Sequence, residues 1–123
     1  MTYDRNNVFA RILRGELPAK KIYEDEYALA FHDIRPLAAI HVLVIPKRDY
    51  VSFDDFIATA RAAEITGFFR AVGKTAELLG VRADGYRLLA NHGVNAHQEI
   101  PHFHVHLFAG QSLGPMLVRT RKD

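Results

Sequence analysis

The chain has 123 residues and a mass of 13.9 kDa, and 49% of its residues are hydrophobic and 24% charged. This balance is typical of one soluble globular domain, residues 1–123, and excludes a disordered chain, a collagen-like fibre and a coiled coil. No apolar run approaches the roughly 20 residues of a membrane span, so we expect no membrane partner. The chain has no cysteine and no apolar signal segment, which predicts a cytoplasmic protein.

The net charge is +2, and the 16 basic residues are spread along the chain. The one small basic cluster, Arg119, Arg121 and Lys122, is interpreted as a solvated end, so no nucleic-acid partner is expected. Histidine is the unusual component, because three of the seven histidines alternate along one short segment.

The first half of the sequence predicts a short helix followed by strands. Asn7 is a suitable N-cap for a helix over residues 8–14, and Gly15 suits the end of that helix. Runs of β-branched and apolar residues then predict strands over residues 21–23, 28–32 and 41–45. The last of these, closed by Pro46, is nearly all apolar and is expected to be a central strand.

The second half begins with a long helical pattern. Ser52 and Asp55 resemble a capping box, and the pattern predicts one long helix that ends at Gly80, with Gly67 and Gly73 as interior weak points. Two further strands are expected over residues 86–90 and 102–108. Because helices and strands do not alternate, the predicted class is α+β: a five-stranded, mainly antiparallel sheet with one short and one long helix.

The last expected strand carries the most informative pattern. Side chains alternate between the faces of a strand, so His102, His104 and His106 are expected on one face, about 7 Å apart. Phe103, Val105 and Leu107 are expected on the other face, against the core. Three imidazoles that titrate near neutral pH, side by side, favour a site for an anionic group.

Two chemistries use such a row. Zinc needs ligands about 2 Å from one ion, whereas the outer histidines of a flat strand are about 13 Å apart. A zinc site therefore needs His41 or another residue to complete it. In phosphate chemistry, one imidazole attacks phosphorus and its neighbours donate hydrogen bonds. The geometry favours phosphate.

The same residues carry a resemblance to a family. The pattern His-φ-His-φ-His-φ-φ, where φ is apolar, is the signature of the histidine triad (HIT) superfamily. The blocks FARILRGELPAKKIYEDE, AFHDIRPLAAIHVLVIPKRDY and QEIPHFHVHLFAG resemble its purine nucleoside phosphoramidase branch over nearly the whole chain. The resemblance implies a HIT-like fold and a homodimer in which the long helix and the edge strand meet their copies. It implies no obligatory metal or other cofactor.

The resemblance also implies roles for individual residues. His104 matches the nucleophile, with its other ring nitrogen held by a backbone carbonyl, and His102, His106 and His41 match its supporting histidines. Asp33 matches the ribose-binding carboxylate. The remaining implied nucleotide-binding positions are Ile34 against the sugar or base, Val8, Phe9, Ile12, Phe31 and Leu43 around the base, and Asn91, His97, Gln98 and Glu99 near the phosphate. Without the resemblance, Phe9, Ile12 and Leu43 are typical core residues and Asp33 is typical of a turn.

The predicted function is hydrolysis of the P–N bond of purine nucleoside 5′-phosphoramidates through a nucleotidyl-histidine intermediate, with a purine nucleoside monophosphate as product. Glu99 departs from the family pattern, in which Ser or Thr is usual in eukaryotic members, and this favours an amine or cationic leaving group. Three alternatives stay open: a dinucleoside polyphosphate hydrolase or nucleotidyl transferase, a purine-nucleotide sensor or scaffold with incidental turnover, and a zinc-binding protein.

Overall fold

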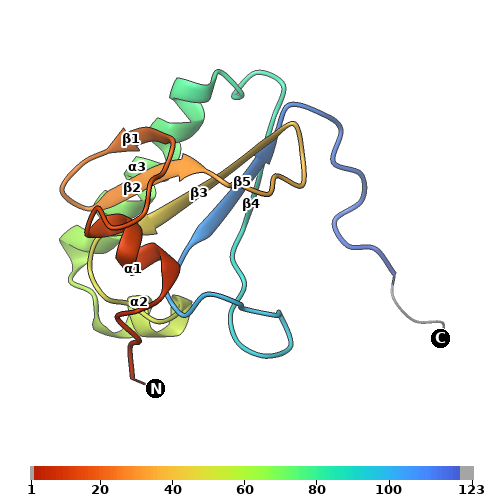
Figure 1. Ribbon diagram of the computed structural model, residues 1–123. Helices are drawn as coiled ribbons and strands as arrows, with labels where there is room; N and C mark the ends of the chain where they lie inside the picture. The colour runs from red at the N-terminus through yellow and green to blue at the C-terminus, as the bar shows by residue number, and fades with distance from the viewer. Residues whose placement is uncertain (1, 120–123) are drawn as a thin grey trace.

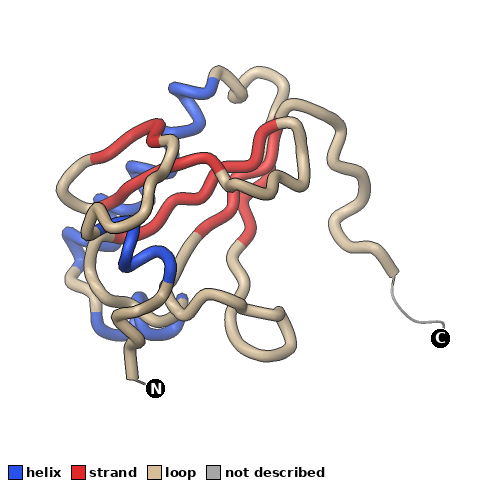
Figure 2. Tube along the Cα trace, viewed as in Figure 1, coloured by secondary structure: helices blue, strands red, loops and turns tan. Residues whose placement is uncertain are grey.

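A computed structural model describes residues 2–119 of the chain. Within this range five strands form one antiparallel sheet in the order β1-β2-β3-β5-β4, drawn in red in Figure 2. The strands span Lys21–Glu24 (β1), Ala28–His32 (β2), Ile40–Pro46 (β3), Arg87–Leu89 (β4) and Val105–Ala109 (β5). The α+β class and the antiparallel sheet are therefore confirmed, with β3 in the centre as predicted.

Helices cover both faces of the sheet. They span Val8–Leu13 (α1), Phe53–Thr59 (α2) and Ala62–Leu79 (α3). In Figure 1, α3 lies behind the sheet and α1 lies in front of it. Because side chains alternate along a strand, the central strands supply both layers. Ala30 and Val42 join the core cluster under α3, whereas Phe31 and Leu43 join a smaller cluster with Phe9 of α1.

The short helix α1 begins at the predicted residue and ends at Leu13, one residue before the predicted end. The Asn7 side chain accepts a hydrogen bond from the Ala10 backbone N–H at 2.9 Å, which satisfies one of the free donors of the first turn. Gly15 has a φ of +77°, a conformation that costs glycine little, so the chain can turn sharply after the helix. Within α1, Phe9 faces the sheet and packs against Phe31, with 5.8 Å between ring centroids.

The structure corrects the prediction of one long helix, because the chain leaves the helical conformation at Ala60 and Arg61, where ψ is 147° and 156°. One helix over residues 53–79 would be about 40 Å long, whereas the seven residues of β3 span only about 23 Å. The break allows Phe56 of α2 and Phe68 of α3 both to contact Phe103, at ring-centroid distances of 4.9 and 5.2 Å.

The last strand is shorter than predicted, since β5 begins at Val105 and the ladder with β3 ends where Val105 faces Val44. The preceding residues are held by other bonds: the Phe103 N–H donates to the Tyr50 carbonyl at 2.7 Å. The predicted alternation nevertheless holds, because Phe103, Val105 and Leu107 are all buried in the cluster under α3. The edge strand β4 is also shorter than the expected 86–90.

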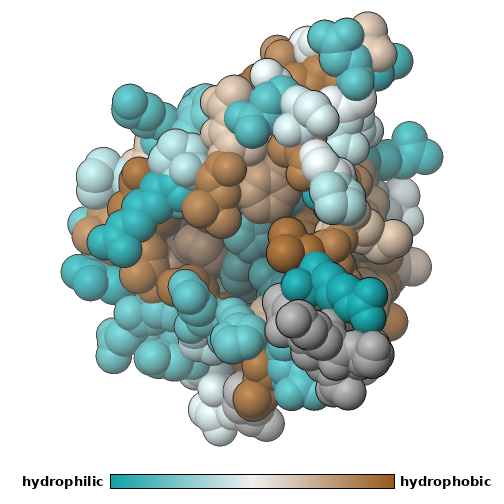
Figure 3. All heavy atoms as spheres, turned by 90° about the vertical axis from the view of Figure 1, so that its right-hand side faces the viewer, coloured by the Kyte–Doolittle hydropathy of each residue, from teal (hydrophilic) through white to brown (hydrophobic). Residues whose placement is uncertain are grey.

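Beyond β5 the chain leaves the sheet and runs to the right in Figure 1. Figure 3 shows that side of the molecule, where apolar patches alternate with hydrophilic groups around a hollow. Arg121 and Lys122, interpreted from the sequence as part of a solvated end, lie outside the described residues. Within residues 2–119 no helix is both long and apolar enough to cross a membrane.

Candidate active site

A pocket of about 320 Å³ lies on the α1 side of the sheet, where β3 and β5 meet the loop before β5. Two of the three alternating histidines, His104 and His106, line it. Its other walls are Phe9, Asp33, Leu37, Leu43, Asn91, Ala96, His97, Gln98, Glu99 and Ile100. The sequence reasoning missed three of these, Leu37, Ala96 and Ile100. They are apolar residues in irregular segments, so no periodicity pointed to them.

His104 has one ring nitrogen committed to the backbone. Its Nδ1 lies 2.7 Å from the His102 carbonyl oxygen, which can only accept, so Nδ1 carries the proton and donates it. In the neutral ring Nε2 therefore keeps a free lone pair. The ring is buried and packs edge-on against Phe9, with 4.9 Å between ring centroids. Burial lowers the pKa of His104. The ring is thus held as a neutral nucleophile of one tautomer.

His106 receives a hydrogen bond from His41 on the neighbouring strand. The Leu37 backbone N–H donates to His41 Nδ1 at 3.1 Å, so in the neutral ring the proton of His41 sits on Nε2. That proton is donated to His106 Nδ1, 2.9 Å away. The proton of a neutral His106 is therefore on Nε2. His106 can offer this N–H to a ligand in the pocket that its ring lines.

Burial keeps these histidines neutral. It lowers the pKa of His41, against the opposing effect of the Asp33 carboxylate. The pKa of His106 falls to about 4, chiefly through burial and then through the neighbouring rings of His104 and His41. Burial therefore leaves the rings of His41, His104 and His106 in their neutral form near pH 7. An incoming phosphate meets a nucleophile that needs no separate base.

Asp33 lies at the end of β2 and combines two roles that the sequence left as alternatives. Its Oδ1 accepts from the Arg35 backbone N–H at 2.8 Å, which is a turn interaction. Its Oδ2 lies 3.5 Å from His41 Nε2 and lines the histidine pocket. Each carboxylate oxygen has two lone pairs, so both can still accept hydroxyl groups.

Among residues 2–119, Asp33, His41 and His106 are the set whose donor atoms come close enough for a metal, within 4.8 Å of one another. The hydrogen bonds argue against a zinc ion there. Because the Leu37 N–H occupies His41 Nδ1, a metal on Nε2 would have to remove the only proton of that ring. The same proton already links His41 to His106.

His102 departs from the predicted row of three rings. Its side chain is 0% exposed and does not line the pocket. Its Nε2 lies 2.9 Å from the Pro46 carbonyl oxygen, and its Nδ1 meets the Tyr3 hydroxyl. Of the three rings only His104 and His106 are adjacent in the pocket, 5.0 Å apart between centroids, closer than the 7 Å expected because they tilt edge to face. Because the His102 ring has no exposed surface, it can support His104 from beneath but presents no atom to the pocket.

The residues expected around the base divide into three groups. Phe9 and Leu43 line the pocket. Ile12 and Phe31 are buried in the cluster beneath it, the core role that their spacing alone indicates. Val8 and Ile34 are exposed, and Ile34, at 89%, lines a different opening.

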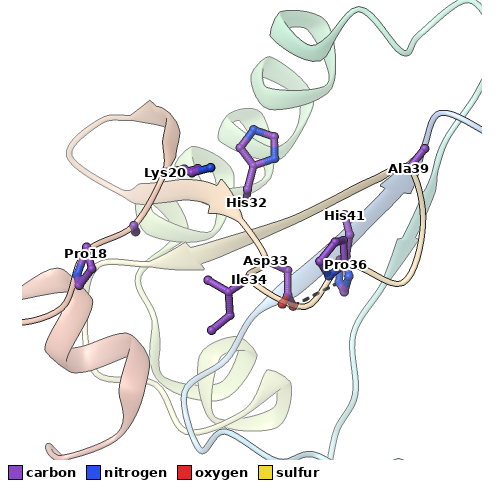
Figure 4. Close-up of a pocket in the computed structure, with 9 residues that line it drawn as sticks. Pro18, Lys20, His32, Asp33, Ile34, Pro36, Ala39 and His41 are labelled. Atoms are coloured by element: carbon purple, nitrogen blue, oxygen red, sulfur yellow. Dashed lines mark ion pairs between the residues drawn. The ribbon is translucent and has the colours of Figure 1, made fainter.

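That second opening has a volume of about 680 Å³, is lined by His41 among others, and shares Asp33 with the histidine pocket. Figure 4 shows Asp33 pointing toward His41, while His32 points to the opposite side, as the alternation of the strand predicts. Ile34 and Pro18 contribute apolar walls. The two openings meet at the Asp33 carboxylate.

The loop before β5 supplies the rim of the histidine pocket, and the residues predicted near the phosphate, Asn91, His97, Gln98 and Glu99, all line it. The Gln98 side chain is engaged within the protein: its amide donates to the Val51 carbonyl at 2.8 Å and its Oε1 accepts from the Gly93 N–H at 3.2 Å. His97 has a φ of +57°, a left-handed conformation that is uncommon outside glycine but that histidine, like asparagine and aspartate, adopts more often than other residues. These contacts fix the shape of the loop around the two histidines.

Comparisons with known proteins identify the family. A model of the HIT domain matches residues 14–113. The chain belongs to the HIT family. It is 61% identical over 118 residues to an uncharacterised HIT-like protein of Azospirillum brasilense, covering 96% of this chain and 97% of that protein. It is 38% identical over 110 residues to the purine nucleoside phosphoramidase of Escherichia coli, covering 89% and 92%.

The solved structures place the fold in the same family. A HIT family hydrolase from Clostridium thermocellum superposes with a TM-score of 0.85 at 40% identity, covering 94% of this chain and 99% of that one. A HIT family hydrolase from Legionella pneumophila has a TM-score of 0.82 at 35% identity, covering 89% and 96%. Together with the pocket, these relatives support a nucleotide hydrolase of the HIT family.

Proposed function

We propose that this HIT protein hydrolyses purine nucleoside 5′-phosphoramidates. One observation carries the proposal: the bond from His104 Nδ1 to the His102 carbonyl leaves Nε2 as a free, neutral nucleophile at a pocket large enough for a phosphoryl group. Beside it, His106 holds its only proton on Nε2 and can donate to a phosphoryl oxygen. A nucleophile and a donor on the same wall are what displacement at phosphorus requires.

The proposed reaction has two displacements. In the first, the lone pair of His104 Nε2 forms a bond to the α-phosphorus while the P–N bond of the substrate breaks, and the leaving nitrogen takes one proton from solvent and departs as an amine. In the second, water attacks the same phosphorus, the electron pair of the P–Nε2 bond returns to His104, and the attacking water gives one proton back to solvent. The sum is phosphoramidate plus water giving nucleoside monophosphate plus amine. No metal-bound nucleophile is needed, because the imidazole supplies one.

The substrate would span the two openings that meet at Asp33. The phosphoryl group lies against His104 and His106, and the vicinal ribose hydroxyls donate to the Asp33 carboxylate. The base has apolar surface available on both sides, from Phe9 and Leu43 in one opening and from Ile34 in the other. Phosphate, ribose and base would thus follow one another along the site, as they do in a nucleoside 5′-phosphate.

Glu99 supports an amine over a phosphate as the leaving group. Its side chain is exposed and lines the pocket with His104 and His106. A carboxylate there repels the extra anionic groups of a dinucleoside polyphosphate and attracts a cationic amine. The relative named as a purine nucleoside phosphoramidase supports the same reaction class.

The decisive experiment is single-turnover mass spectrometry. The protein is mixed with an adenosine 5′-phosphoramidate and quenched early, and the peptide holding His102–His106 is searched for added nucleotidyl mass. We expect the adduct and AMP release in the wild type and in His92→Ala, whose exposed ring pairs with Asp54 away from the pocket. Both signals should vanish in His104→Ala.

The alternatives predict other results. If AMP binds but neither an adduct nor turnover is detected, the protein is a nucleotide sensor and not a hydrolase. Faster cleavage of diadenosine polyphosphate than of the phosphoramidate would reassign the substrate class. Stoichiometric zinc in protein made without an affinity tag, lost on replacing His41, would favour the zinc-binding alternative.

We also propose that the protein is a homodimer. Among the strands of residues 2–119, β4 is at the edge of the sheet and pairs with β5 alone. Leu88 of this strand is 47% exposed, and Tyr86 beside it is also exposed. A second copy that paired along β4 would cover this edge and its apolar side chains. Light scattering after size exclusion should give twice the 13.9 kDa chain mass, whereas a single species at that mass would refute the dimer.

A further inference from the structure

We infer that Tyr3, in the segment before α1, is a positioning residue for His104 that acts through the buried ring of His102. This inference rests on the proposed function for its kinetic consequence, but the contacts that carry it are independent of the substrate. The Tyr3 hydroxyl meets His102 Nδ1, and the two rings lie edge to face with 5.5 Å between centroids. Ninety-nine positions separate the two residues along the chain.

The hydrogen bonds define a single state of His102. The Pro46 carbonyl can only accept, so the His102 ring donates from Nε2, and its Nδ1 must accept in the neutral form. The donor at Nδ1 is the Tyr3 hydroxyl. Without it, a fully buried lone pair would have no partner, because the ring has no exposure to water. To avoid this unpaired Nδ1, the His102 ring would have to turn, or its proton would have to move from Nε2 to Nδ1.

Any such movement reaches the nucleophile through the backbone. The carbonyl of the same residue, His102, accepts the hydrogen bond that fixes His104 Nδ1 at 2.7 Å. This residue lies before the first residue of β5, and on the backbone its peptide group is held by the Phe103 N–H, which donates to the Tyr50 carbonyl at 2.7 Å. Phe9 packs against the rings of both His102 and His104, at 6.2 and 4.9 Å. The direction of the His102 carbonyl therefore depends on two anchors, the backbone bond to Tyr50 and the side-chain ring held by Tyr3 and Pro46, and loss of the Tyr3 hydroxyl loosens the second.

The test replaces the hydroxyl alone. Tyr3→Phe is compared with Tyr23→Phe, a matched control in which the lost hydroxyl donates to Asp25 at 2.8 Å in β1. With the adenosine phosphoramidate, we expect Tyr3→Phe to lower kcat about tenfold or more while KM stays within twofold, because no residue of the pocket changes. Tyr23→Phe should leave both constants within twofold of the wild type. Equal kcat in the folded Tyr3→Phe protein overturns the inference.

Imidazole nitrogen NMR gives a readout that needs no turnover. In the wild type, His104 should be protonated on Nδ1 and His102 on Nε2, and the Nδ1 proton of His104 should exchange about tenfold faster in Tyr3→Phe. If the wild type fails to cleave the phosphoramidate, the proposed function fails while this spectrum still decides the role of Tyr3. If Tyr3→Phe does not fold, the wild-type spectrum decides alone, and a proton on His102 Nδ1 would overturn the inference.

Discussion

The buried state of His102 predicts a measurable loss of stability in acid. Burial lowers the pKa of this ring from 6.5 to about 4, outweighing the hydrogen bond to the Pro46 carbonyl, which raises it. Between these two pH values the unfolded chain binds a proton that the folded protein excludes. The contribution of His102 to the free energy of unfolding is therefore fully present above pH 6.5 and is lost as the pH falls toward 4. At about 1.4 kcal/mol per pH unit, the full window corresponds to roughly 3 kcal/mol.

Urea unfolding at pH 7.5 and pH 4.5 measures this effect. By pH 4.5 the free energy of unfolding should have lost most of the contribution of His102, roughly 2 to 3 kcal/mol. The variant His102→Gln removes the titrating group but keeps an amide that can donate to Pro46 and accept from Tyr3. Between pH 7.5 and pH 4.5, the free energy of unfolding of His102→Gln should therefore fall by roughly 2 to 3 kcal/mol less than that of the wild type. His92→Gln, which changes an exposed ring, should follow the wild type. Parallel pH profiles for wild type and His102→Gln would refute the reasoning.

Three substitutions test the packing and capping of the helices, each by urea or thermal unfolding. Gly67→Ala should destabilise the protein by about 1 to 3 kcal/mol, because an added Cβ would fall 2.2 Å from the Tyr27 ring. Gly73→Ala, with nothing within 4 Å of the added Cβ, should instead stabilise α3, by up to about 1 kcal/mol; a loss would contradict the open surface there. Asn7→Ala should cost about 1 kcal/mol, because the first turn of α1 loses the bond to Ala10, and an unchanged midpoint would show that water replaces the cap.

Local patterns were sufficient for much of the architecture. Asn7 marks the start of α1 and Gly15 lies just after its end, and both could be recognised because helix caps depend on residues only a few positions apart. The alternation around His104 was correctly predicted to bury Phe103, since period two is a property of any extended chain. The family signature, too, is contained within contiguous blocks of sequence. These features required no knowledge of which distant segments meet.

The sequence by itself therefore determined the class of the fold, the buried face of the last strand and the family. Tertiary structure decided which histidines share the pocket. His106 is paired with His41 across 65 positions, and His102 is turned away from the pocket by Tyr3 and Pro46, at separations of 99 and 56. Each ring has two nitrogens that can donate or accept, and only the partner brought by the fold selects one state. Residue spacing along a strand carries no information about that partner.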